Sequence, residues 1–463
     1  MWGLQFNIVF EVWQFRVRSI LIRAWSGLGR TKWWGQQTRF SIRQKSGPGQ
    51  EDTFPITEEA GLYLHWPYCQ RRCTYCNFNK YIARDVDHNA MMKCLVRETE
   101  TLLRLSQVKR ISSIFFGGGT PSLALPSTVA AILESVAKRA QLPSDAEVTL
   151  EVNPTSVGAS KLSEFRSAGV NRFSIGIQSL HDPDLVLLGR DHTSQHAQQT
   201  LEEAKKLCPG RTSVDVIFGR PGQSVESWEK ELEELLLLCC DHVSLYQLTL
   251  ERGTALFKQV QDGKLSVPSE ELTAQMYNAA RRILGKCGFR QYEVSNFAKN
   301  DAVSVHNLAY WKGRQYIGIG PGAHGRFVPL GDGAMLREAR IQTLEPDFWM
   351  REVQRCGHGT RKRVPLSRLD VSEEAMVMGL RMTEGITHEH WKQICPEWSL
   401  QEIFKGSQEV QGLLQEGLLI MDSRGVRCSW GGLAVLDSML PALLNQLQMT
   451  ASGERQSKQE TTF

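Results

Sequence analysis

Long uninterrupted apolar runs are missing from this sequence of 463 residues. No stretch approaches the roughly 20 apolar residues that a membrane-spanning helix needs, so a transmembrane segment is not expected. The eleven cysteines also lack the dense, even spacing of a secreted disulfide framework. We therefore expect a globular chain in a reducing compartment, with one large domain and one smaller domain.

Acidic residues are nearly missing from the first 50 positions, which carry eight Lys or Arg and only Glu11 as an acid. An arginine-rich, acid-poor leader is typical of a mitochondrial transit segment, so we expect residues 1–50 to direct import into the matrix. The five tryptophans before position 35 are unusual for such a peptide. A leader without a targeting role is the alternative.

An excess of positive charge is missing once this leader is set aside. The first 50 residues carry a formal net charge of +7 and the remainder −3, of a total of +4. A mildly acidic body offers no broad surface for phosphates, so nucleic acid is not expected as a partner. A P-loop, a dinucleotide-binding fingerprint and a Ser/His/Asp triad are missing too, since the run GGGTPS at 117–122 has no lysine.

Short β-branched or aromatic runs alternate with longer amphipathic stretches from residue 61 onward. The alternation predicts an α/β fold, a parallel sheet with helices outside that forms a partial (β/α) barrel over residues 55–330. Polar residues at the carboxyl ends of its strands should converge on one mouth. The expected strands are 61–66, 111–116, 147–152, 172–177, 213–218 and 242–250, with helices near 88–106, 126–141, 158–168, 194–208, 224–239 and 269–287.

The pattern changes after residue 330. A small helical, winged-helix-like domain is expected over 331–449, with a hairpin before its last helix. This segment has no basic stripe, so contact with protein or a lid over the barrel is favoured over DNA binding. The polar tail 450–463 is expected to be disordered. The expected helices of this domain are 371–382, 386–394, 400–415 and 431–447.

One tight group of cysteines stands out, with the spacing C-x3-C-x2-C directly after the first expected strand. Its members are Cys69, Cys73 and Cys76. Three thiolates at this spacing can hold three irons of a [4Fe–4S] cluster and leave the fourth iron free for a small molecule. The alternative is a zinc site with His65 as fourth ligand, although zinc sites usually join two paired elements and no second pair is present.

Several separate motifs resemble the radical S-adenosylmethionine proteins, in the branch related to oxygen-independent coproporphyrinogen III oxidase. They are YLHWPYC, FFGGGTPS, EVNP, FSIGIQS, LGRDH, DVIFGRPGQ, YEVSN and HNLAYW, spread from Leu62 to beyond His324. The resemblance implies a partial (β/α) barrel of the radical SAM type, a [4Fe–4S] cluster on the three cysteines and bound S-adenosylmethionine. The residues it implies for binding this cofactor are Tyr63, Tyr75, Gly118, Gly119, Thr120, Glu151, Gln178, Arg190 and Asp215.

The chemistry of these residue types agrees with such a ligand. Glycines after a strand let the backbone approach it, and carboxylates and Arg190 can pair with its ammonium and carboxylate groups. A glycine-rich turn alone more often serves packing or phosphate binding, so this interpretation depends on the cysteines beside it.

Two features separate the branches of the family. The oxidases carry a further cysteine two residues after the third ligand, where this chain has Phe78. They also have a long N-terminal arm before the barrel, where this chain has only residues 51–60 between the transit-like segment and the first expected strand. An HNxxYW pattern instead resembles the HemW-like heme chaperones. Its residues are His306, Asn307, Tyr310 and Trp311.

The HNxxYW pattern suits heme, because histidine is a common axial ligand and aromatic rings can lie against the macrocycle. The alternative is a histidine and two aromatic residues packed at a domain junction. Tyr292 and Glu293 could line the same pocket, and His324 is a second candidate ligand, although a glycine-rich turn with one histidine is usually only a turn.

The resemblance implies a heme chaperone that binds heme, the cluster and S-adenosylmethionine and delivers heme to apo-hemoproteins, such as those of the respiratory chain. A homodimer and transient contact with a membrane surface are compatible with this function. The alternative is an active radical enzyme of the coproporphyrinogen III oxidase type, acting on a tetrapyrrole. Phe78 and the HNxxYW pattern favour binding over turnover.

Overall fold

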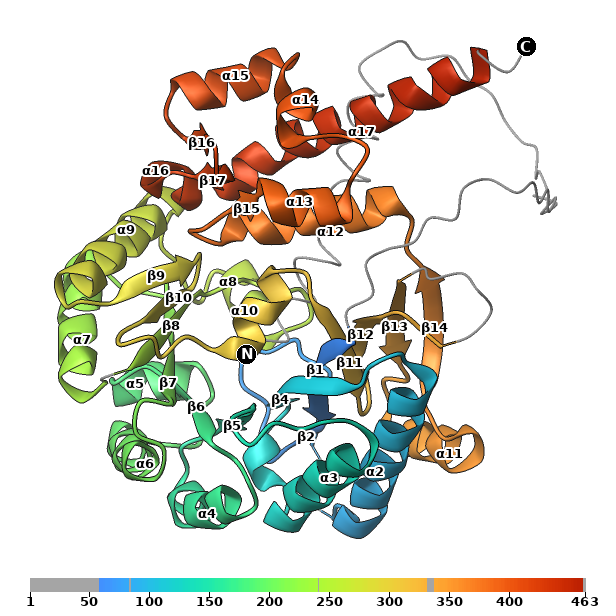
Figure 1. The fold of residues 1–463 in the computed structure, drawn as a ribbon. Coiled ribbons are helices and arrows are strands. Elements are labelled where there is room, and N and C mark those ends of the chain that lie inside the picture. Colours follow the sequence, from blue (N-terminus) through green and yellow to red (C-terminus); the bar gives the residue numbers. More distant parts are fainter. Residues whose placement is uncertain (1–57, 83–84, 240, 331–336, 461–463) are drawn as a thin grey trace, which may run out of the picture.

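The computed structural model describes residues 58–82, 85–239, 241–330 and 337–460, without the side chains of 156–160 and 454–460. The predicted transit segment lies outside these residues. Within them, a large α/β unit carries a smaller, mainly helical unit at one end (Figure 1). Each unit has its own main hydrophobic core, as the sequence predicted.

Seven parallel strands form the centre of the large unit, in the order β11-β1-β4-β5-β6-β7-β8. They are buried almost along their whole length, because helices cover one face and the other face lines the interior of the curved sheet. Six of them were expected from the sequence. Their bounds are β1 (Glu59–Trp66), β4 (Arg110–Gly118), β5 (Glu147–Val152), β6 (Arg172–Gln178), β7 (Thr212–Phe218), β8 (His242–Gln247) and β11 (Gln315–Ile319).

Antiparallel strands extend this sheet at both edges. Beyond β8 lie β10 (Asn296–Ala298) and β9 (Arg290–Glu293), and beyond β11 lie β12 (His324–Phe327), β13 (Glu338–Gln342) and β14 (Thr360–Pro365). No ladder joins β9 to β14 in the described ranges, so the predicted partial barrel is confirmed.

The predicted domain boundary at residue 330 is wrong. The strands β13 and β14 and the helix α11 (Pro346–Cys356) belong to the large unit, whose sheet ends at Pro365. The exposed strand β14 reads TRKRVP and lacks the apolar alternation from which a strand is normally predicted.

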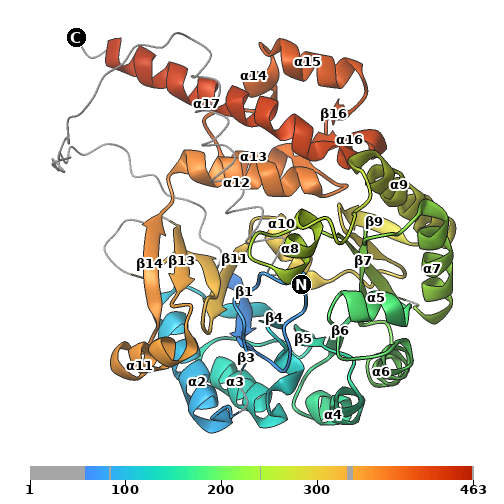
Figure 2. The ribbon, with the colours of Figure 1, turned by 180° about the vertical axis from the view of Figure 1, so that it is seen from behind.

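Helices cover the outer face of the sheet, as both ribbon views show (Figures 1 and 2). Polar residues cap several of them: the side chain of Asp87 accepts from Ala90 N, and Thr193 and Ser224 each begin a capping box. These helices are α2 (His88–Leu105), α3 (Pro126–Arg139), α4 (Ser156–Ser167), α6 (Ser194–Leu207), α7 (Val225–Leu238) and α9 (Glu270–Lys286).

The smaller unit begins at Arg368 and combines helices with a three-stranded sheet of order β15-β17-β16. The hairpin β16–β17 precedes its last helices, which agrees with the predicted winged-helix-like form. Its elements are α12 (Arg368–Arg381), β15 (Ile386–Thr387), α13 (His388–Ile394), α14 (Leu400–Phe404), α15 (Gln408–Gln415), β16 (Leu419–Met421), β17 (Gly425–Cys428), α16 (Trp430–Ala434) and α17 (Leu436–Glu460).

The predicted disordered tail 450–463 is wrong over most of its length, because α17 continues to Glu460. Residues 450–460 contain no proline and include Ala, Glu, Arg, Lys and Gln, which favour a helix despite their polar character.

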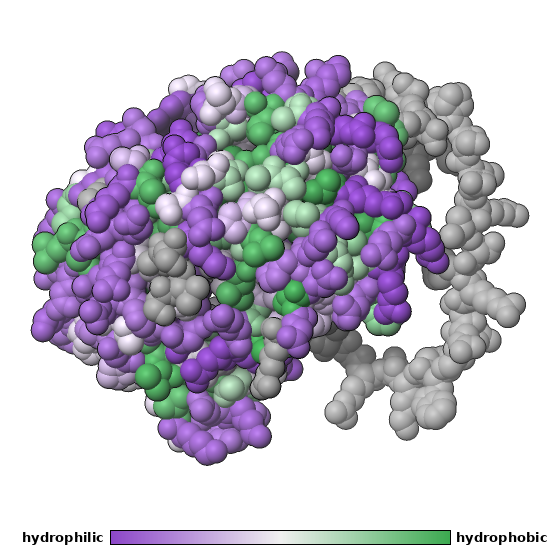
Figure 3. Space-filling model, turned by 90° about the horizontal axis from the view of Figure 1, so that it is seen from below, coloured by the Kyte–Doolittle hydropathy of each residue, from purple (hydrophilic) through white to green (hydrophobic). Residues whose placement is uncertain are grey.

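Among the described residues, no helix is both long and apolar enough to cross a bilayer. On the face seen in Figure 3, hydrophilic residues dominate, and hydrophobic ones lie in separate small patches.

Candidate functional site

The three cysteines of the C-x3-C-x2-C motif lie in one loop at the carboxyl end of β1. Cys69 ends the short strand β2 (Tyr68–Cys69), which pairs in parallel with β3 (Tyr81–Ile82). Cys73 and Cys76 follow in a turn in which the backbone N–H of Cys76 donates to the oxygen of Cys73 at 3.4 Å. The turn brings the motif to one side of a single pocket.

Three polar side chains hold this cysteine loop. Thr120 Oγ1 donates to Cys69 Sγ at 3.3 Å, and Arg190 Nη1 lies 3.5 Å from Cys73 Sγ. Lys80 Nζ donates to the backbone oxygen of the third cysteine at 2.6 Å. The donors all point toward sulfur or the loop backbone, so they would stabilise negative charge on thiolates.

Burial makes two of the three sulfurs poor thiolates on their own. It raises the pKa of the Cys69 thiol to about 11 and also raises the pKa of Cys76. These two sulfurs therefore favour the thiol form at neutral pH until a cation compensates the charge, and binding of iron would release their protons.

A pocket opens beside the cysteine loop at the carboxyl ends of the central strands. The space inside it that atoms leave free, including the part open to solvent, is about 1110 Å³. The structure brings together eight of the nine residues expected for S-adenosylmethionine, and their contact with that molecule stays a prediction. The eight are Tyr75, Gly118, Gly119, Thr120, Glu151, Gln178, Arg190 and Asp215.

The ninth residue, Tyr63, does not line this pocket. Its ring lies inside the curved sheet, stacked on Phe115 with 6.2 Å between centroids, and its hydroxyl lies 3.1 Å from His65 Nδ1. Alternate residues of a strand share a face, so Tyr63 and His65 support the strand end beneath the pocket.

Two glycines shape the floor of the pocket. Gly118 has φ +110°, and a Cβ there would lie 2.8 Å from the ring of His65. A Cβ at Gly119 would lie 2.8 Å from the backbone oxygen of Tyr68. Only glycine lets the end of β4 pass this close to the cysteine loop.

Replacing Gly118 by alanine should therefore cost stability and cofactor affinity. Gly222 is a matched control, because its φ is +74° but no atom lies within 4 Å of an added Cβ. Both variants should lose about 1–2 kcal/mol of unfolding free energy from backbone strain. Only Gly118→Ala should lose about 1–3 kcal/mol more from the clash and bind S-adenosylmethionine more weakly. Urea unfolding and equilibrium dialysis measure both effects, and equal behaviour of the two variants would contradict this account.

Gln178 and Arg190 present polar atoms that the protein leaves unpaired. Gln178 has the unusual φ of +69° at a register irregularity in β6, and its Oε1 has no hydrogen-bond partner among the described residues. Arg190 donates through Nη2 to Gly176 O at 3.0 Å and to Asn153 Oδ1, whereas its buried Nε has no partner in the same ranges. Strained backbone and orphaned polar atoms are features of ligand sites.

Two carboxylates complete the pocket. Burial, with a smaller contribution from the nearby charge of Glu151, raises the pKa of Asp215 to about 6. Ser174 Oγ lies 3.1 Å from Asp215 Oδ2 and holds the side chain in place. A positively charged ligand in the pocket would favour the ionised form of Asp215.

The donor set fits the two groups that the sequence indicates. Three sulfurs face one pocket, Phe78 lines it in place of a fourth thiol, and orphaned polar atoms lie beside them. Such a set suits a [4Fe–4S] cluster with one open iron and a polar ligand next to it. Asn153, Asp191, Lys80 and Lys161 also line the pocket but were not assigned to the cofactor from the sequence.

Replacing Arg190 by alanine should weaken S-adenosylmethionine binding by about 10–100-fold, the expected loss of a charge-assisted hydrogen bond. Iron content should stay unchanged, because the contact of Arg190 with Cys73 is long and not a coordinate bond. Equilibrium dialysis and iron analysis of the same sample measure both quantities. Arg211→Ala, at an exposed arginine, is the control; loss of iron from Arg190→Ala alone would show that its role is structural.

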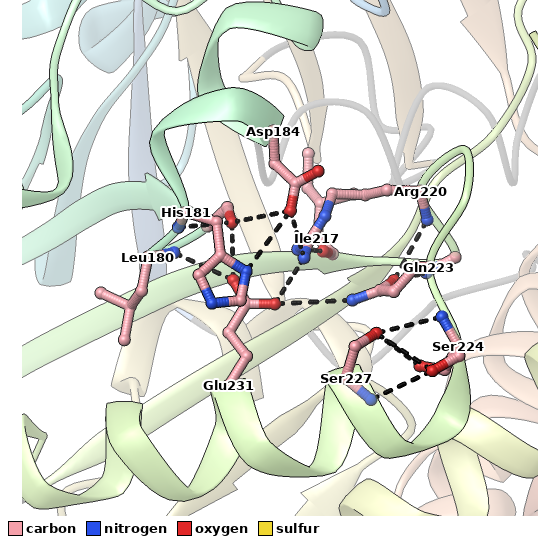
Figure 4. A network of polar contacts seen from close by, with 11 residues as sticks. Leu180, His181, Asp184, Ile217, Arg220, Gln223, Ser224, Ser227 and Glu231 are labelled. Carbon is pink, nitrogen blue, oxygen red and sulfur yellow. Dashed lines mark hydrogen bonds and ion pairs between the residues drawn. The ribbon is translucent and has the colours of Figure 1, made fainter.

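A buried polar network surrounds Arg220 (Figure 4). Arg220, 1% exposed, pairs with Asp184 Oδ2 at 3.0 Å and with Glu231. His181, Asp184 and Glu231 lie close enough together to suggest a cation site. The guanidinium of Arg220 already compensates these carboxylates, so no metal site is assigned to them.

This network positions the cysteine loop through the helix α5 (Asp182–Leu187). Directly after α5, Leu188 O accepts from Thr74 N at 3.0 Å, and Thr74 Oγ1 donates to Leu187 O at 2.9 Å. Thr74, which stands between Cys73 and Cys76, is thereby anchored to the end of a rigid helix. This anchor preorganises the cysteine loop.

The four HNxxYW residues lie together on the short helix α10 (Val305–Trp311), and all are buried. His306 Nδ1 lies 2.8 Å from Ser113 Oγ, and Glu147 at the start of β5 accepts from His306 N at 3.0 Å. The motif is thus packed inside the curved sheet against the amino-terminal halves of its strands. The cysteine pocket lies at the opposite strand ends.

His306 is only 1% exposed, and its Nε2 has no hydrogen-bond partner in the described part of the chain. Burial lowers the pKa of His306 to about 3, so the imidazole is neutral, the form that binds iron. The geometry matches the packed domain-junction alternative, and ligation of heme by His306 stays a prediction.

The other residues considered for heme lie in two places. Tyr292 is beside the motif, where its hydroxyl accepts from Asn307 Nδ2 at 3.0 Å and lies 2.8 Å from His242 Nε2. Glu293 follows it on β9 and is fully buried. His324 starts β12, where burial and the nearby positive charge of Arg326 lower its pKa to about 3.

A column of aromatic rings connects the two ends of the interior. Tyr63 stacks on Phe115, and Phe115 stacks on His306 with 5.0 Å between centroids. Tyr310 meets His306 edge to face at 4.6 Å and Tyr316 at 4.4 Å. The HNxxYW helix and the residues beneath the cofactor pocket are therefore parts of one packed core.

Comparison with known families agrees with this geometry. Residues 63–235 match the family model described as the Radical SAM superfamily, and residues 366–435 match the HemN C-terminal domain. The second match begins just after β14, where the large sheet ends.

Several individual proteins are similar over most of their length. The mitochondrial Radical S-adenosyl methionine domain-containing protein 1 of Danio rerio is 64% identical over 391 residues, covering 84% of this chain and 88% of the relative. Heme chaperone HemW of Escherichia coli is 35% identical over 282 residues, covering 61% and 73%. The structure of the coproporphyrinogen III oxidase HemN from Escherichia coli is similar in fold, with a TM-score of 0.68 at 20% identity over 85% of this chain and 90% of that one.

Proposed function

Because this chain belongs to the radical S-adenosylmethionine superfamily, in the family of heme chaperone HemW and its mitochondrial relatives, we propose that it is a mitochondrial heme chaperone. It binds heme, a [4Fe–4S] cluster and S-adenosylmethionine and delivers heme to apo-hemoproteins. The observation that carries this proposal is the pocket in which three cysteines face Phe78 where the oxidase branch has a further cysteine.

The cluster and its cofactor occupy the pocket at the carboxyl ends of the strands. Cys69, Cys73 and Cys76 hold the cluster, which can supply an electron to a bound sulfonium when reduced. Arg190 and Gln178 orient S-adenosylmethionine through their unpaired polar atoms. In the chaperone these groups control conformation and heme release rather than turnover.

Heme is the cargo of this protein, and the HNxxYW helix supplies its iron ligand. His306 offers a neutral imidazole with a free Nε2, and Tyr310 packs against its ring. A buried, uncharged nitrogen surrounded by aromatic rings has the chemistry of an axial heme ligand. Iron can reach it only if the helix is uncovered.

The mitochondrial matrix is the proposed location. Its support is the arginine-rich, acid-poor leader of this chain and the mitochondrial names of close relatives from Danio rerio, Bos taurus and Mus musculus. Apo-hemoproteins of the respiratory chain are the proposed acceptors. The same proposal includes a homodimer, in which the state of the cluster regulates the contact between the two chains.

A heme titration followed by a transfer assay tests this function. The cluster-reconstituted chain should bind one heme per chain and transfer it to apo-myoglobin as a probe acceptor. Heme-loaded serum albumin is the control for passive release. Failure to bind heme, or transfer no different from the albumin control, would overturn the chaperone proposal.

The second candidate function is oxidative decarboxylation of coproporphyrinogen III. Its ground is the similarity of the fold to the coproporphyrinogen III oxidase HemN. At 20% identity that similarity concerns the fold alone. The three-cysteine pocket is compatible with turnover, so only a direct product assay separates the two functions.

A further inference from the structure

The junction between the large unit and the C-terminal unit is built around the HNxxYW helix. The end of α12 reaches over α10, and Arg381 places its guanidinium 4.7 Å from the ring centroid of Trp311. The same arginine pairs with Glu293 of β9 at 3.8 Å, and both side chains are buried. Arg381 of the C-terminal unit therefore contacts the carboxyl end of α10, and Glu384 of the same unit pairs with Lys312 directly after the helix.

Backbone contacts reinforce this junction next to Arg381. Its carbonyl oxygen accepts from Val294 N at 3.0 Å, and Thr383 N donates to Tyr292 O at 3.1 Å. Thr383 Oγ1 donates to Gln291 O at 2.7 Å. The backbone of residues 291–294 thus contacts the C-terminal unit, and the side chain of Tyr292 in the same segment contacts Asn307.

The two ends of α10 are held by different units. At its start, the carboxylate of Glu147 accepts from the backbone N–H groups of Val305 and His306 at 3.1 and 3.0 Å, and this glutamate belongs to the sheet. At its end, Trp311 lies under Arg381 of the C-terminal unit. Loosening of the C-terminal unit would free the second end while the first stays anchored.

Some buried polar atoms at this junction lack a hydrogen-bond partner in the described part of the chain. His306 Nε2 and Arg381 Nε are buried without a hydrogen-bond partner in the described ranges, and Glu293 Oε2 has no hydrogen bond there beyond its 3.8 Å ion pair with Arg381. Buried polar atoms of this kind cost free energy in the closed state, and an opened junction would offer them water or iron. Opening such a junction therefore costs less free energy than opening one in which every buried polar atom has a hydrogen-bond partner.

We propose that Arg381 is a positioning residue that holds the C-terminal unit over the HNxxYW helix. Heme iron then reaches His306 only when the C-terminal unit loosens from β9. The inference rests on the proposed heme-binding function and adds to it the element that controls access. Movement of Trp311 and Tyr310 uncovers the edge of the His306 ring, since Tyr310 packs against that ring at 4.6 Å.

The test replaces Arg381 by methionine, which keeps much of the buried stem but removes the charge, in the full-length chain. Arg340→Met is the matched control, because Arg340 is also buried, lies 4.7 Å from the ring centroid of Phe327 and pairs at 3.0 Å with Glu338, but these contacts lie within the large sheet. Two readouts are used: the rate of heme association by stopped flow, and amide hydrogen exchange of residues 305–311 without heme.

Arg381→Met should speed heme association by about tenfold or more and raise hydrogen exchange in 305–311, whereas Arg340→Met should leave both readouts near those of the unaltered chain. If Arg381→Met does not fold, Thr383→Val, which removes one hydrogen bond of the junction, should act in the same direction with a smaller effect. A folded variant with unchanged exchange and an unchanged association rate overturns the inference.

The two proposals fail in different ways. If the unaltered chain and every variant bind no heme, the proposed function is overturned, and the inference about heme access falls with it. If the unaltered chain binds heme through His306 but neither readout responds to Arg381→Met or Thr383→Val, the chaperone proposal stands and the closing role of Arg381 is overturned.

Discussion

Replacing Cys73 by serine should reduce the iron content of the reconstituted chain to less than about a tenth of that of the unaltered chain. Serine offers an oxygen that stays protonated and binds iron–sulfur clusters poorly, and the remaining two thiols cannot hold a cubane. The visible absorbance of the cluster should disappear with the iron. Iron analysis and absorbance spectra of anaerobically prepared protein measure this result.

The fold should survive this substitution, because Cys73 is only partly buried and lies in a loop. The unfolding free energy of the two proteins, compared without iron, should agree within about 1 kcal/mol. Cys287→Ser is the matched control, since Cys287 is exposed and stands outside the pocket, and it should retain full iron. Normal iron in Cys73→Ser would refute the ligand assignment.

Replacing His306 by alanine should weaken heme binding at least about tenfold and change the absorbance of the bound heme, because an axial ligand is lost. His306 is fully buried, so the variant also removes packing against Phe115 and the hydrogen bond with Ser113. His306→Gln, which keeps more of the volume and a polar end, should show the same spectral change with a smaller loss of stability. Heme titration and thermal unfolding separate the two effects.

The competing ligand is His324, and His324→Ala therefore serves as the comparison variant. If His306 binds the iron, the heme spectrum of His324→Ala should match that of the unaltered chain. A normal spectrum in both His306 variants, with a changed spectrum in His324→Ala, would move the ligand to the start of β12.

Most of the large fold could be predicted because its strands are apolar and its helices amphipathic. The runs that became β4 and β7 are almost wholly buried, and the helices between them keep one apolar face. The strand β14 and the end of α17 were missed for the opposite reason. Both are polar, and their structure depends on pairing with β13 or on continuation of a helix rather than on an apolar pattern.

The cofactor pocket could be located because the residues at the ends of parallel strands share one edge of a sheet. The orientation of a single residue was less predictable: Tyr63 stands three residues before the end of β1, and packing inside the sheet, not its type, decides that it faces Phe115. Asn153 stands directly after β5 and was not assigned a contact from the sequence, and the structure pairs it with Arg190.

The burial of the HNxxYW helix could not be predicted from its residues. The spacing of His306 and Tyr310 places both on one side of a helix, but a period of 3.6 does not say whether that side faces solvent or the interior. The decisive partners come from distant segments: Ser113 and Glu147 from the sheet and Arg381 from the C-terminal unit. Only the folded chain shows that the candidate heme ligand lies behind a domain junction.

The most direct test of the central claim is a product assay beside a heme titration. The anaerobically reconstituted chain is given dithionite, S-adenosylmethionine and coproporphyrinogen III, and 5′-deoxyadenosine and decarboxylated porphyrinogen are quantified. We expect stoichiometric heme binding without decarboxylated product. Decarboxylation in stoichiometric or catalytic amounts would make this chain an oxidase and contradict the use of Phe78 and HNxxYW as marks of a chaperone.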